Sequence, residues 1–147
     1  MTTVSLLIAL ASPVVAVVIA VWSLRRTSRS DRLRAFFEIQ ERYLDADVRL
    51  GRRLLHREVA GRESDAMAQL SGEAASRIGY ALAVMNSIAI ACEGKYVDTE
   101  LVALSMGRSY AGAIEAAKPY IDYVERQRGF RPYPFAERLA VQLRTSV

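Results

Sequence analysis

EAASRIGYALAVMNSIAIAC, residues 73–92, is the stretch of sequence that decides the fold. Apolar residues recur along it every three or four positions and cover a broad face, and Gly94 follows as a helix stop. The pattern predicts the central core helix of an all-α protein. Its uncharged run, 78–92, is 15 residues long and contains Asn86 and Ser87, so it is too short and too polar to predict a membrane span.

Two further helices are expected before this core helix. The first starts at Ser30 or Asp31 and carries Glu38 and Arg42 as an i,i+4 pair. If it ran on unbroken, Asp47 would fall on its apolar face, so we expect a break at 45–47. Asp47 then caps a helix over 48–59 that ends near Gly61, and a single helical turn is expected at 65–70.

After the core helix, Asp98 is expected to cap a long amphipathic helix. Pro119 should restart or bend the chain into a short helix that ends at Gly129, and Pro134 should open a last helix through Arg144. No run of alternating β-branched residues predicts a strand. The predicted fold is therefore all-α, with one N-terminal transmembrane helix followed by a cytoplasmic bundle of about five helices.

The transmembrane helix is expected at residues 4–24, VSLLIALASPVVAVVIAVWSL, which carry no formal charge. As a helix these 21 residues span about 31 Å, the thickness of a hydrocarbon core. Arginines follow the segment and none precede it, so the positive-inside rule places residues 1–3 outside. The basic segment 25–30 and the helical domain 31–147 are then cytoplasmic, in a single-pass protein of the inner membrane.

One side of this expected span consists of small residues. Lipid does not drive helices together, so spans associate where small side chains let backbones approach. We interpret the arc as a helix–helix contact face; the alternative is that alanine and serine are simply frequent here. The face comprises Ser5, Ala9, Ser12, Ala16, Ala20 and Ser23.

Basic charge is concentrated beside the expected membrane. Residues 25–57 hold ten arginines and five acidic residues, whereas 58–147 hold ten basic and eleven acidic residues. Such a juxtamembrane excess favours the anionic lipid of the inner leaflet over nucleic acid as the partner. The residues expected at the headgroups are Trp22, Arg25, Arg26, Arg29 and Arg32.

Few residues suit catalysis or metal binding. The chain has one cysteine, Cys92, and one histidine, His56, which lies among arginines and would need a carboxylate to orient it as a base. No nucleophile elbow or glycine-rich phosphate loop is present. We therefore predict no enzyme activity, metal, cofactor or small-molecule substrate. Asn86 and Glu93, at the edge of the core helix's apolar face, are candidate polar anchors.

Aromatic and basic residues alternate near the C-terminus. Aromatic rings among arginines are typical of protein-binding hot spots and of surfaces that stack nucleic-acid bases. The alternative interpretation is that the rings fix the last two helices to the core. The candidate partner patch is Arg126, Arg128, Arg131 and Tyr133.

Four segments follow the expected N-terminal span: RAFF (34–37), RLGRRLL (49–55), MNSIAIACEGKYVDTELV (85–102) and KPYIDYVERQRG (118–129). Together with the span they resemble a bacterial family of membrane-anchored helical domains of unknown function. The resemblance covers nearly the whole chain. It implies a helical fold and supplies no catalytic residues.

The sequence thus predicts a membrane-tethered helical interaction or regulatory module without catalytic activity. It is expected to bind lipid, and to bind a protein partner or itself through the transmembrane helix. The alternative is a small oligomerising membrane effector, such as a phage exclusion, lysis or toxin component.

Overall fold

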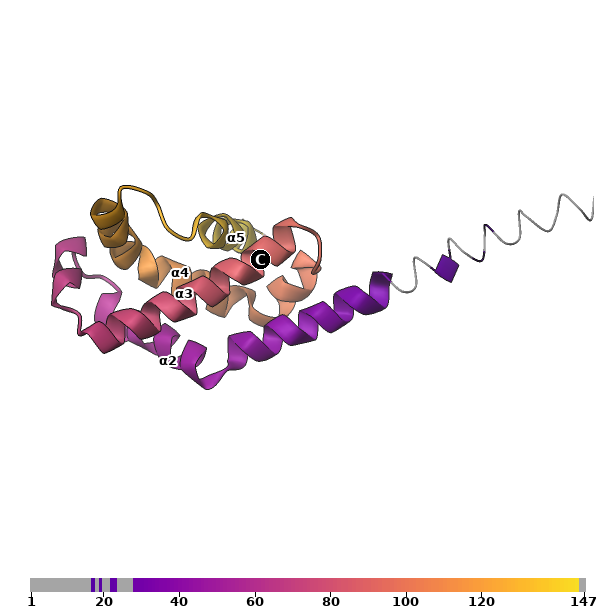
Figure 1. Cartoon of the computed structure of the whole chain (residues 1–147), viewed down its shortest axis with the longest axis horizontal. Helices are drawn as coiled ribbons and strands as arrows, with labels where there is room; N and C mark the ends of the chain where they lie inside the picture. Colours follow the sequence, from indigo (N-terminus) through magenta and orange to yellow (C-terminus); the bar gives the residue numbers. More distant parts are fainter. Residues whose placement is uncertain (1–16, 18, 20–21, 24–27, 146–147) are drawn as a thin grey trace, which may run out of the picture. The chain divides into compact units, whose positions relative to one another are not determined.

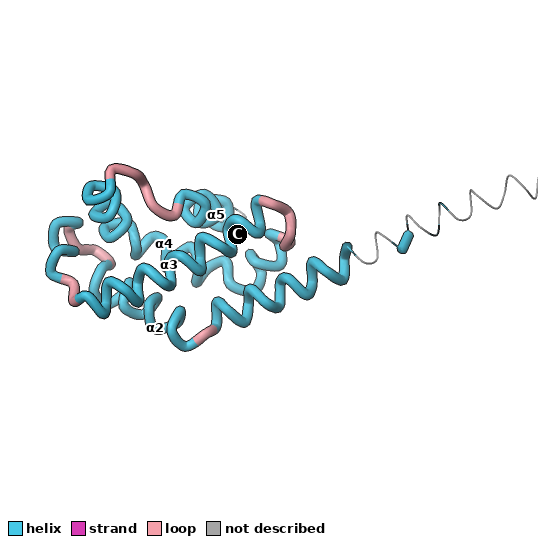
Figure 2. Tube along the Cα trace, in the orientation of Figure 1, coloured by secondary structure: helices cyan, strands magenta, loops and turns pink. Residues whose placement is uncertain are grey.

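The computed structural model describes residues 17, 19, 22–23 and 28–145. Over these residues the chain is helical and contains no strand, which confirms the predicted all-α class. Figure 2 shows helices joined by short loops through this part of the chain. The chain divides into two compact units, Met1–Arg34 and Ala35–Val147.

In the first unit the structure describes only part of the segment predicted to span the membrane. The described residues there are helical: Val17, Ile19, Trp22 and Ser23. The exposed fraction is 61% for Val17, 59% for Ile19 and 62% for Trp22. The rest of 4–24 lies outside the described residues. The transmembrane helix therefore stays a prediction.

A bend at Asp45 separates the helical residues 28–44 from α2 (Ala46–Leu54). The expected break at 45–47 is confirmed, as is the pair between Glu38 and Arg42, at 3.6 Å. The capping residue is different, because the Asp45 carboxylate accepts the Asp47 N–H at 2.8 Å. Asp47 is thus free to pair with Arg77, at 3.2 Å.

The helix predicted over 48–59 changes its winding before it ends. After α2 the chain continues as a π-helical turn, η1 (Leu55–Val59), in which Leu55 and Val59 are fully buried. The extra residue in a π turn rotates the helix face, and here both ends of the turn point into the core. Gly61 then has a left-handed φ of 71°, and η2 (Ser64–Gln69) is a 3-10 helix where one turn was predicted.

The core helix is α3 (Gly72–Glu93), and its predicted position is confirmed. Ser71 caps it through a 3.1 Å bond from the Ala74 N–H. Figure 1 shows α3 between α2 on one side and α5 on the other, and it packs on both. Among the described helices, α3 alone is long and apolar enough to cross a membrane, which is weak evidence because a buried core helix passes the same test.

The next helix, α4 (Thr99–Arg128), corrects the prediction that Pro119 ends a helix. Asp98 caps its start as expected, and Gly129 ends it with a left-handed φ of 74°. Proline costs the helix one hydrogen bond at position 119. The helix nevertheless continues, because Ala117 and Ile121 on either side of the proline are fully buried. Packing on both sides outweighs the lost bond.

The last helix is α5 (Pro134–Thr145), which packs on α3 and α4. Proline at its first position confirms the predicted start, since the missing N–H has no partner there in any helix. Ala136, Leu139, Ala140 and Leu143 form its buried face. The helices from α2 to α5 thus enclose one core, with Ile78, Leu82 and Met85 of α3 fully buried inside it.

Candidate functional site

The predicted membrane-facing residues are only partly described. Of the small-residue face, Ser23 is described and the other five residues lie outside the described part. Of the headgroup residues, Trp22, Arg29 and Arg32 are exposed, while Arg25 and Arg26 lie outside it. Both sites stay predictions.

The predicted partner patch contains two arginines that bind neighbouring acidic residues. Arg126 donates to Asp65 at 2.7 Å. Arg131 donates to both carboxylate oxygens of Glu137, at 2.6 and 2.7 Å, and also reaches Asp122 and Glu125. These carboxylates, Glu137 foremost, raise the pKa of Arg131 above its ordinary value. Arg131 therefore ties the start of α5 to the end of α4.

Two tyrosine rings of the same region reach the core helix. The hydroxyl of Tyr120 donates to the carbonyl of Ala75 at 3.3 Å, and that of Tyr133 donates to Gly79 at 3.4 Å. Burial raises the pKa of both hydroxyls, which keeps them as donors. The rings thus attach the C-terminal helices to α3, as the alternative interpretation predicted. All three arginines of the patch are exposed, and Arg128 is the one that forms no ion pair with a described acidic residue.

The two candidate polar anchors behave differently. The Asn86 side-chain oxygen accepts the Ala136 N–H at 3.1 Å, in a partly buried position. Glu93 is exposed and pairs with Arg138 at 2.9 Å. Cys92 is buried, and burial raises the pKa of its thiol. No group of His, Cys, Asp and Glu in the described part of the chain could hold a metal ion.

A polar cluster that the sequence did not predict joins three segments. The guanidinium of Arg52 in α2 lies over the ring of Tyr43, 3.9 Å from its centre. It donates to the hydroxyl of Ser109 in α4 at 2.7 Å and to the Tyr43 carbonyl at 3.4 Å. The Tyr43 hydroxyl also donates to Ser109, at 3.0 Å. Separations of 57 and 66 residues give no sequence signal for this cluster.

The positive charge of this cluster is not neutralised by a described carboxylate. Arg52 is partly buried, forms no ion pair with a described acidic residue, and has a buried Nε–H without an acceptor. Burial raises the pKa of Tyr43, against the opposing effects of Ser109 and Arg52, so its hydroxyl stays protonated. The cluster is therefore rich in donors and carries net positive charge.

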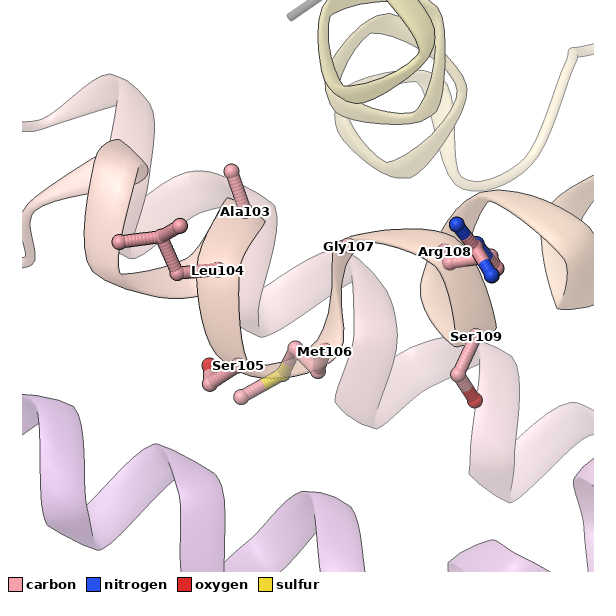
Figure 3. Close-up of a pocket in the computed structure, with 7 residues that line it drawn as sticks. All are labelled: Ala103, Leu104, Ser105, Met106, Gly107, Arg108 and Ser109. Carbon is pink, nitrogen blue, oxygen red and sulfur yellow. The ribbon is translucent and has the colours of Figure 1, made fainter. Parts of the chain in front are cut away.

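A surface hollow of about 550 Å³ lies along α4 beside this cluster. Figure 3 shows Ser105, Met106 and Ser109 extending from the side of α4 opposite Ala103. Arg108 also lines the hollow, and its described lining contains no acidic residue.

The outer face of α3 forms a second surface, which we call the α3 stripe. Its five positions are exposed, uncharged and spaced alternately four and three residues apart. The exposed fraction is 53% for Tyr80 and 45% for Ile90. The Ser87 hydroxyl donates to the Ala83 carbonyl at 3.0 Å, so its polar group is satisfied within the helix. The α3 stripe comprises Ser76, Tyr80, Ala83, Ser87 and Ile90.

The comparisons with known proteins give a family and no function. No curated protein and no solved structure matches the chain. One family does, described as a domain of unknown function, and its match covers residues 10–142. The chain therefore belongs to the DUF4760 family, a domain of unknown function.

Proposed function

We propose that the protein is a membrane-tethered helical interaction module without catalytic activity, and that it acts by assembling with a second copy of itself. In this proposal residues 4–24 anchor it in the inner membrane, with the N-terminus outside and the helical domain in the cytoplasm. The basic residues after the span bind anionic lipid. The α3 stripe provides the contact surface of the helical domain.

The α3 stripe is the observation that carries this proposal. Alternating four- and three-residue spacing averages 3.5 residues, the repeat that keeps one helix in continuous contact with another. From Ser76 to Ile90 the stripe is about 21 Å long. Large exposed side chains lie near its ends, at Tyr80 and Ile90, and small ones at its centre, at Ala83 and Ser87. Small central residues let two helix backbones approach closely.

A second copy fits this pattern when the two α3 helices run antiparallel. With the two-fold axis near residue 85, Tyr80 of one chain faces Ile90 of the other, and Ala83 faces Ser87. The exposed Glu73 at the start of one stripe then lies near the exposed Lys95 beyond the end of the other. Opposed helix dipoles add to this complementarity. Self-complementarity of one surface is what a two-fold interface requires.

Disulfide cross-linking tests the pairing in the full chain in membranes. On a Cys92→Ser background, chains carrying Tyr80→Cys should cross-link to chains carrying Ile90→Cys when the two are mixed. Each alone should cross-link little, because equivalent residues lie about 15 Å apart along the antiparallel pair. Ala83→Arg should reduce the mixed product at least tenfold, whereas the matched control Ala68→Arg, at an exposed alanine of η2, should not.

This design separates the α3 stripe from the transmembrane helix. Association through residues 4–24 brings chains together without selecting the 80–90 pair. Cross-linking that is equal for mixed and single variants, or that survives Ala83→Arg, overturns the proposed interface. Loss of a different co-purifying protein in Ala83→Arg, with no mixed product in the parent, would assign the stripe to that partner and overturn self-assembly.

A further inference from the structure

We propose that the hollow along α4 binds a phosphate group or a similar oxyanion, through Ser109 and Arg108 and with Arg52 as a fixed positive charge. The site is separate from the α3 stripe. The inference rests on the hydrogen bonds of Ser109, on charges without a described acidic partner, and on the size and lining of the hollow.

The Ser109 hydroxyl has one donor left to use. A serine oxygen accepts two hydrogen bonds and donates one. Its two acceptor positions are filled, by the Tyr43 hydroxyl at 3.0 Å and by Nη1 of Arg52 at 2.7 Å. The O–H must therefore point away from both donors. Ser109 is exposed and lines the hollow, so an acceptor that enters there can accept a hydrogen bond from this O–H.

Any such acceptor is held close to a positive charge. Ser109 lies 2.7 Å from Nη1 of Arg52, and a second hydrogen bond is about 2.7 Å long, so the acceptor lies within about 5.5 Å of that nitrogen. Stacking on Tyr43 fixes the guanidinium in place. An anion is favoured over a neutral acceptor because the guanidinium has no described carboxylate to balance it.

Arg108 supplies a second charge at the same hollow. It is exposed, lines the hollow, and forms no ion pair with a described acidic residue. The other polar side chain of the lining, Ser105, donates to the Val102 carbonyl at 3.4 Å and is thus already engaged. The hollow of about 550 Å³ is much larger than a free phosphate ion and admits a phosphate attached to a larger molecule.

The same chemistry can come from free phosphate or from a lipid headgroup, and two arms of one experiment distinguish these sources. The full chain is placed in lipid bicelles, which contain no other protein, and thermal unfolding of its helices is followed by far-UV circular dichroism. In the first arm inorganic phosphate is titrated against chloride at equal ionic strength. In the second arm bicelles of phosphatidylcholine are compared with bicelles that also contain phosphatidic acid.

A ligand that binds only the folded protein raises the unfolding temperature. We expect this rise for the parent chain in at least one arm. Ser109→Ala and Arg108→Gln should weaken the apparent affinity about tenfold each, because each removes a hydrogen bond or charge offered to the anion. Arg108 is exposed, so its variant tests the site even if Ser109→Ala perturbs the Tyr43 and Arg52 contacts.

The matched control is Arg53→Gln, which removes the same charge from an exposed position next to Arg52. It should keep the parent response. A response in the lipid arm alone that Ser109→Ala and Arg108→Gln weaken supports the site and identifies a headgroup as the source. A lipid response that both variants keep comes from the basic residues after the span and overturns the site. No response in either arm overturns the proposal, as does a loss in Arg53→Gln equal to that in Arg108→Gln, since that result indicates diffuse charge instead of a site.

Discussion

Gly51 lies at a close contact between α2 and α3. A Cβ atom placed on it would be 2.4 Å from the Arg77 carbonyl oxygen and 2.6 Å from the Ala81 Cβ. Both neighbours belong to the α3 backbone or lie directly on it, so neither can move without shifting the helix. The absence of a side chain at Gly51 therefore sets the spacing of the two helices.

We expect alanine substitution to change the free energy of unfolding in opposite directions at two glycines. Gly51→Ala should lower the free energy of unfolding by about 2–3 kcal/mol, because overpacking exceeds the gain in helix propensity. Gly112→Ala, in α4 with nothing within 4 Å of its new Cβ, should raise it by about 0.5–1 kcal/mol. Urea unfolding measures both, and a stabilising Gly51→Ala would contradict the described packing.

Local residue roles were predictable from the sequence, while contacts between distant residues were not. The cap at Asp98, the stop at Gly129 and the start at Pro134 depend on neighbours within one turn, and all three are confirmed. Ser109 bonds residues 57 and 66 positions away. No local pattern in the sequence contains that information.

At the scale of elements, a side chain of α3 caps the N-terminus of α5. The residue before it, Tyr133, has a left-handed φ of 57°, and its hydroxyl is directed to Gly79. The Tyr133 side chain therefore does not cap the helix. The side-chain oxygen of Asn86 accepts the Ala136 N–H, one of the four amide groups that a helix start leaves without an internal partner. A cap that is normally local is here supplied by another helix.

Replacing this cap should destabilise the α3–α5 contact. Asn86→Leu should lower the free energy of unfolding by about 1–2 kcal/mol, because it leaves the Ala136 N–H without an acceptor. Asn86→Asp should retain most of the stability near neutral pH, because a carboxylate accepts the same bond and suits a helix N-terminus. Guanidinium unfolding measures both variants; equal losses would show that the amide acts by packing alone.

Helix winding was less predictable than helix position. The core helix at 73–92 was placed within a residue at each end, because its apolar face repeats over five turns. The π turn at 55–59 and the passage of α4 through Pro119 were not predicted. Both depend on which side chains the rest of the fold buries, and a local pattern does not specify that.

At the scale of the whole molecule, the proposed anchor adds a second place where chains can meet. The small-residue face of 4–24 predicts that Ala16→Leu weakens association in membranes about fivefold, since a larger side chain keeps two backbones apart. Val17→Leu, off that face, is the control. Chemical cross-linking of the full chain in membranes measures the dimer fraction, and an unchanged fraction in Ala16→Leu refutes the face.

The buried thiol of Cys92 can be used to measure local opening of the helical bundle. It is the single sulfhydryl in the chain and is 6% exposed near the end of α3. A thiol reagent can reach it fully only when that end of the helix separates from its neighbours. The rate of labelling in the native state therefore counts these openings directly. A ligand or partner that tightens the bundle will slow the reaction, and no cysteine has to be engineered into the chain to measure it.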